Sequence, residues 1–65
     1  MKIIYSSRTG DIVFAKTKWK GKVDYAGYDF RTGVVQTDRC WLYSEEEFSE
    51  FCDEFIRLIR EQYEL

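Results

Sequence analysis

The chain of 65 residues contains no histidine. Histidine is the usual general base near neutral pH and the commonest protein ligand for transition metals, so its absence removes the most frequent catalytic and metal-binding arrangements. The sequence also lacks a phosphate-cradling glycine loop, a nucleophile elbow and the spaced ligands of a metal site. We therefore predict a protein that is not an enzyme and that holds neither a cofactor nor a metal ion.

Proline is also absent, cysteine occurs twice and no apolar run is long enough to cross a bilayer. The beginning of the chain has no signal-peptide pattern, so the protein is expected to be cytoplasmic. In that compartment Cys40 and Cys52 are expected to be buried thiols, although a disulfide between them stays open. Without a linker or a low-complexity stretch, residues 1–65 form one domain.

The aromatic content is high, with two Trp, five Tyr and five Phe, and it gives a small chain a dense core. Runs rich in β-branched and aromatic residues predict an antiparallel β-meander of three to four strands within residues 1–43. The predicted strands are Lys2–Ser6, Asp11–Thr17, Val23–Tyr28 and Val34–Tyr43. Turn-forming residues separate these runs.

Residues 44–65 have the period of one long amphipathic helix. Ser44 and Glu47 have the spacing of a capping box at its start. The predicted fold class is therefore α+β, with the C-terminal helix packed on the sheet.

Charge is divided along the chain. Residues 1–39 hold eight Lys or Arg and four Asp, whereas residues 40–65 hold eight Asp or Glu and two Arg. In a meander, the turn at 20–22 lies at the end of the sheet where the helix begins, which brings its lysines near Glu45, Glu46 and Glu47. The two charges are then expected to cancel partly in space.

A basic hairpin with Trp19 near its tip is the first candidate site. Its lysines would contact phosphates while the indole ring stacks on a base. The alternative is a solvated hairpin whose Trp19 folds back onto the sheet. The nucleic-acid-binding set predicted from the sequence is Lys16, Lys18, Trp19, Lys20, Lys22, Arg31 and Arg39.

The motif Arg-Thr-Gly occurs at residues 8–10 and again at 31–33, in two turns that the meander brings to the same end of the sheet. Paired guanidinium groups would bind a small anionic ligand. Ordinary turn chemistry, with glycine at positive φ, is the alternative.

The acidic face of the helix would complement a basic partner surface, and a sheet covered on one face leaves some aromatic rings exposed. The predicted protein-binding residues are Glu46, Glu50, Asp53, Glu54, Trp41 and Tyr43. The final turns of the helix, with Leu58, Ile59, Tyr63 and Leu65, are expected to extend beyond the sheet, and a homodimer would cover them.

The layout from Trp41-Leu42 to Phe48, a strand end followed by a Ser-capped, Glu-rich helix, is loosely similar to plant AP2-type and integrase arm-type DNA-binding domains. That resemblance implies DNA binding through basic and aromatic residues on the exposed sheet face. The chain departs from it in lacking a dense set of sheet arginines.

The sequence thus favours a small binding protein. Two classes of macromolecular partner stay open, and a small anionic ligand bound by the Arg-Thr-Gly turns is the third alternative. The first is a protein partner, bound by an inhibitor or accessory factor of the phage or mobile-element type, a class that includes inhibitors of host defence systems. The second is nucleic acid, bound through the sheet. No membrane partner is expected.

Overall fold

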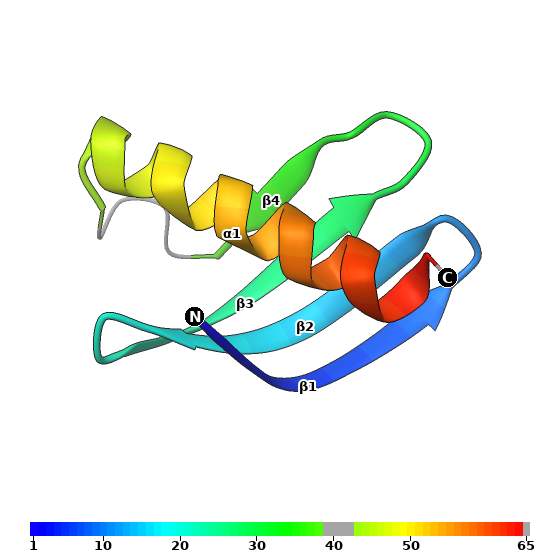
Figure 1. The fold of residues 1–65 in the computed structure, drawn as a ribbon, viewed down its shortest axis with the longest axis horizontal. Helices are drawn as coiled ribbons and strands as arrows, with labels where there is room; N and C mark the ends of the chain where they lie inside the picture. The colour runs from blue at the N-terminus through cyan, green and yellow to red at the C-terminus, as the bar shows by residue number, and fades with distance from the viewer. Residues whose placement is uncertain (39–42, 65) are drawn as a thin grey trace.

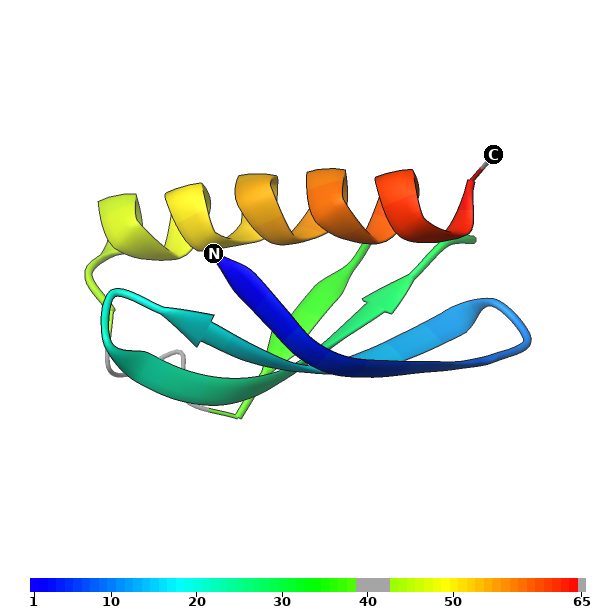
Figure 2. The same ribbon diagram turned by 60° about the horizontal axis from the view of Figure 1, so that its bottom comes forward.

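A computed structural model describes residues 1–38 and 43–64 of the chain. It is a four-stranded antiparallel sheet of order β1-β2-β3-β4, followed by one helix, as the sequence predicts (Figure 1). The strands are β1 (Lys2–Thr9), β2 (Ile12–Trp19), β3 (Lys22–Asp29) and β4 (Val35–Thr37). The helix, α1, comprises Glu45–Tyr63 and lies across one face of the sheet, which gives two layers (Figure 2).

The two long hairpins turn tightly. Lys20 and Gly21 link β2 to β3, and both have positive φ, 51° and 75°. Such a pair forms the two-residue turn whose twist matches that of the flanking strands. The pairing of β1 with β2 shifts register between Ile3 and Tyr5, where Ile4 forms a bulge in the edge strand.

Alternation along the strands produces the core. In β2, Val13, Ala15, Thr17 and Trp19 are buried, and the residues between them face away from α1. The helix contributes Phe51, Phe55 and Ile59, which recur every four residues and are fully buried against the sheet. The core therefore lies between the two layers, and the opposite face of the sheet is left uncovered.

The predicted start of α1 is confirmed. The Ser44 hydroxyl accepts a hydrogen bond from the Glu47 amide at 3.1 Å, and Glu47 Oε1 accepts one from the Ser44 amide at 3.2 Å. This reciprocal pair is a capping box. Within the described residues, no helix is long and apolar enough to span a membrane.

The fourth strand is shorter than predicted. Pairing with β3 ends at Thr37, and Tyr43 lies outside the sheet. The Tyr43 ring packs instead in the core, 5.5 Å from the rings of both Trp19 and Phe51. The chain therefore leaves the sheet before Tyr43, whereas the prediction extended the strand through it. Arg39, Cys40, Trp41, Leu42 and Leu65 lie outside the described residues.

The prediction that the last turns of α1 extend beyond the sheet is wrong for Ile59 and Tyr63. Ile59 is fully buried, and the Tyr63 hydroxyl is 2.8 Å from Ser6 Oγ on β1. Gln62 also donates a hydrogen bond to Ser6 Oγ at 2.9 Å. Strand β1 thus covers the C-terminal turns, because the helix crosses the strands at an angle and does not run parallel to them (Figure 1).

Candidate functional site

The face of the sheet turned away from α1 is the candidate site, and we call it the open face. Residues paired across antiparallel strands project on the same side, so the register identifies the residues of this face. We call each row of paired residues across the strands a rung. The rungs of the open face are Lys2–Lys18–Val23, Tyr5–Lys16–Tyr25, Ser7–Phe14–Gly27–Gln36 and Thr9–Ile12–Asp29. Successive rungs lie about 7 Å apart along the strands.

Three aromatic rings stand on the open face with more than half of their surface accessible. Tyr5 is 63% exposed, Phe14 58% and Tyr25 57%. They come from three adjacent strands and lie on two neighbouring rungs. Exposed aromatic residues gathered on one surface of a small protein are typical of a contact surface.

Lysines alternate with these rings. Lys16 lies between Tyr5 and Tyr25 on one rung, and its ammonium is 5.9 Å from the centroid of the Tyr25 ring. Lys2 and Lys18 are paired on the next rung. Asp29 lies on the rung farthest from the Lys2–Lys18 pair. A second carboxylate, that of Asp38, follows β4 opposite Tyr25, where the Asp38 amide donates to the Tyr25 carbonyl at 3.2 Å. The positive charge of the open face therefore lies on β1 and β2, and its carboxylates lie toward β3 and β4.

A hollow adjoins the Phe14 ring. Gly27 has no side chain, and a Cβ at that position would lie 3.4 Å from Phe14 Cε1, so the ring sits close above the glycine backbone. Beside it is a hollow of about 260 Å³ bounded by Ile12, Val34 and Gln36. Because Gly27 has no side chain, the sheet surface is concave next to the exposed Phe14 ring.

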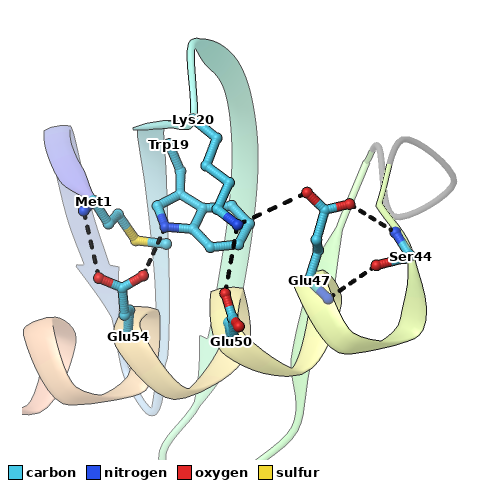
Figure 3. Close-up of polar contacts among 7 residues, drawn as sticks. All are labelled: Met1, Trp19, Lys20, Ser44, Glu47, Glu50 and Glu54. Atoms are coloured by element: carbon cyan, nitrogen blue, oxygen red, sulfur yellow. Dashed lines mark hydrogen bonds and ion pairs between the residues drawn. The ribbon is translucent and has the colours of Figure 1, made fainter.

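At the tip of the basic hairpin, Trp19 and Lys20 contact the helix. Trp19 is buried and donates its indole N–H to Glu54 Oε2 at 2.6 Å (Figure 3). Lys20 Nζ lies 3.5 Å from Glu50 and 3.8 Å from Glu47, while Lys22 lies 5.0 Å from the centroid of the Tyr43 ring. Of the two alternatives for Trp19, the ring folded back onto the sheet is the one observed, and the buried indole is not available to stack on a base. The expected cancellation of charge is observed at Lys20.

The predicted acidic partner surface is divided in two. Glu50 pairs with Lys20, and Glu54 accepts from Trp19 and also lies 3.5 Å from the amino group of Met1 (Figure 3). Glu46 and Asp53 are exposed and form no ion pair within residues 1–38 and 43–64. Tyr43 is buried, which corrects its prediction as an exposed anchor, and Trp41 lies outside the described residues.

The two Arg-Thr-Gly turns are neighbours, as predicted. The Phe30 amide donates to the Asp11 carbonyl at 2.8 Å, which joins the two turns. Arg8, however, donates to the Gly10 carbonyl and lies 4.4 Å from the centroid of the Phe30 ring. Gly10 and Gly33 both have positive φ. These contacts follow ordinary turn chemistry, and the Arg8 guanidinium lies over the Phe30 ring.

Of the nucleic-acid-binding residues predicted from the sequence, Lys16 and Lys18 are placed on the open face, Arg31 lies in the exposed loop between β3 and β4, and Arg39 lies outside the described residues. Lys2, Tyr5, Phe14 and Tyr25 were missed as site residues. Alternation along β2 places Phe14 on the same face as Ile12, Lys16 and Lys18, but it does not say which of the two faces the helix covers.

Three comparisons with known proteins were made with the whole chain. A scan against protein-family models found no match, and searches of curated proteins and of solved structures found none either.

Proposed function

We propose that the chain is a non-enzymatic protein that binds single-stranded nucleic acid on its open face. The observation that carries this proposal is the Tyr5–Lys16–Tyr25 rung with the Phe14 ring beside it. Proteins that bind single strands combine a positive surface along the backbone with aromatic side chains on which bases stack. Lys2, Lys16 and Lys18 supply the first component, and the three rings supply the second.

A single strand fits this face better than a duplex. Rings that stand on a sheet stack only on bases whose own faces are accessible, and a duplex hides those faces in its interior. The helix lies on the other side of the sheet, so its acidic residues are separated from the open face, and this distance reduces their repulsion of phosphates (Figure 2).

Fluorescence anisotropy with labelled single strands of about ten nucleotides tests the proposal. Three phosphate contacts predict that the logarithm of the binding constant falls with the logarithm of the salt concentration with a slope of about −2. The double variant Lys16→Gln, Lys18→Gln should reduce the slope to about −0.7. Lys20→Gln is the matched control, because Lys20 is paired with helix glutamates and should leave the slope unchanged.

Two results would overturn nucleic-acid binding by this face. One is the absence of binding at low salt. The other is a slope that Lys20→Gln lowers as much as the double variant does. A duplex of the same sequence that bound as tightly as the single strand would contradict the stacking mechanism.

A protein partner is the second candidate, and the exposed acids Glu46 and Asp53 favour it. They lie on α1, away from the open face, and would complement a basic partner surface, as in an inhibitor or accessory factor of phage type. Capture of the same protein from bacterial lysate after nuclease treatment, lost in a Glu46→Lys, Asp53→Lys variant, would support this candidate over the first.

The sequence led us to expect a homodimer that covers the end of the helix. We propose instead that two copies associate through their open faces. Ile12, Phe14 and Val23 give this face apolar area that a second copy would bury. A dimer formed in this way would compete with nucleic acid. Sedimentation velocity should then show dimers that dissociate when an oligonucleotide is added.

A further inference from the structure

The hollow beside Gly27 has the size and lining of a pocket for one planar ring. Its volume of about 260 Å³ is below the range of sites for drug-sized ligands, which begins near 300 Å³. Phe14, Ile12 and Val34 give it apolar walls, and Asp29 and Gln36 give it polar ones. A flat group inserted there would meet the Phe14 ring and find hydrogen-bonding groups at its edge.

We propose that this hollow binds one nucleobase whose exocyclic amino group lies on its major-groove edge, namely cytosine or adenine. The inference rests on the proposed function, since the strand bound along the lysine-rich rungs delivers the base. Charge complementarity orients that strand, because phosphates are drawn toward Lys16 and Lys18 on β2 and repelled by Asp29 on the last rung and by Asp38 after β4. The Asp29 end of the face is thus left for a base and not for the backbone.

The preference for an amino group follows from the acceptors in the hollow. Asp29 Oδ1 accepts a hydrogen bond from the Arg31 amide at 2.8 Å, and an ionised carboxylate has capacity for further donors. Gln36 lies opposite, across from Gly27 on β4, with both a carbonyl acceptor and an amide donor. Cytosine and adenine present an amino donor to such a pair, whereas the uracil O4 atom would face a carboxylate.

Gly27 keeps the hollow open. Gly27 does not have a positive φ angle, so its backbone accommodates a larger residue without strain. A valine at this position would place methyl groups beside the Phe14 ring, where the base is to lie. Gly27→Val therefore closes the pocket while leaving the lysines in place.

The experiment compares deoxycytidine and deoxyuridine oligomers of about ten nucleotides at neutral pH by anisotropy, because the two bases have the same ring size. The native chain should bind the cytosine oligomer about five- to tenfold more tightly. Gly27→Val should weaken the binding of both oligomers and remove the preference. Asp29→Asn, which retains the acceptor for the Arg31 amide, should remove the preference with little loss of affinity for uracil.

Val23→Thr is the matched control, since it changes the open face outside the hollow and should keep the preference. Binding of neither oligomer by the native chain would refute the proposed function itself. Equal binding of the two oligomers, or a preference that persists in both Gly27→Val and Asp29→Asn, would overturn the base pocket while leaving nucleic-acid binding intact.

Discussion

Trp19 illustrates how one residue changes a candidate site. It lies beside the turn of the basic hairpin, a position that by itself suits a ring offered to a base. The indole instead packs edge-on against Tyr43 and Phe51, and its N–H finds a charged acceptor in Glu54. Burying so large a ring removes much apolar area from water, and the charge-assisted hydrogen bond satisfies its single polar atom. In a chain this short, the core takes precedence over a binding role for Trp19.

Replacement of Trp19 by Phe should lower the free energy of unfolding by about 2–3 kcal/mol. The variant loses the hydrogen bond to Glu54 and part of the ring volume between Tyr43 and Phe51. Urea denaturation measures the change. Glu61→Ala is the control, because its exposed ion pair with Arg57 should contribute less than about 0.5 kcal/mol. Equal effects of the two variants would contradict the structural role assigned to Trp19.

At the scale of elements, patterns that are local in sequence predicted most of the fold. The helix start followed from Ser44 and Glu47, and the hairpin turn from Gly21, because caps and tight turns depend on a few adjacent residues. The end of β4 and the burial of Tyr43 could not be predicted in this way. They depend on contacts with Trp19 and Phe51, which are distant in sequence.

The candidate site likewise depends partly on local sequence patterns and partly on contacts between distant residues. Alternation in β2 indicated two faces, but it did not say which one α1 would cover or how β1 would align. Lys2 lies beside Lys18 on the open face because the pairing of β1 with β2 shifts at the Ile4 bulge, and no local pattern predicts that bulge. Glu50 and Glu54 were lost from the acidic surface because tertiary contacts engage them.

Acid should weaken the start of α1 through Glu47. The hydrogen bond from the Ser44 amide lowers the pKa of the Glu47 carboxyl below its ordinary value. A depressed pKa in the folded state contributes stability at pH values above about 4.3, and that contribution is lost as the pH falls through the folded-state pKa. Glu47→Gln keeps an acceptor for the Ser44 amide but does not titrate.

Thermal unfolding followed by circular dichroism between about pH 5 and pH 3 measures this contribution. The native chain should lose more stability over that range than Glu47→Gln does. Glu45→Gln should resemble the native chain, because Glu45 lies outside the capping box. If the three proteins lost stability in parallel, the capping carboxylate would not be the titrating group.

At the scale of the whole molecule, the two layers separate stability from binding. Residues between the layers hold the fold together, whereas the rings of the open face contact solvent for more than half of their surface. A side chain that is exposed in the folded protein loses little burial when it is shortened. Substitutions on the two sides of the sheet should therefore have opposite consequences.

The double variant Tyr5→Ser, Tyr25→Ser should change the free energy of unfolding by less than about 1 kcal/mol and weaken single-strand binding at least tenfold. Phe51→Ala should cost about 3–5 kcal/mol, because it empties the centre of the core. Urea denaturation and anisotropy on the same preparations separate the two effects. Unchanged binding by the folded tyrosine variant would exclude these rings from the interface.

The bulge at Ile4 has a consequence for the free edge of the sheet. Strand β1 is an edge strand of eight residues, long enough to act as a template for a strand of another molecule. The register shift between Ile3 and Tyr5 breaks the regular spacing of its unpaired amide and carbonyl groups, and Lys2 adds a charge at its beginning. A regular ladder from a neighbouring chain would therefore stop at the bulge, which protects a protein with an exposed aromatic face from growing into a continuous intermolecular sheet.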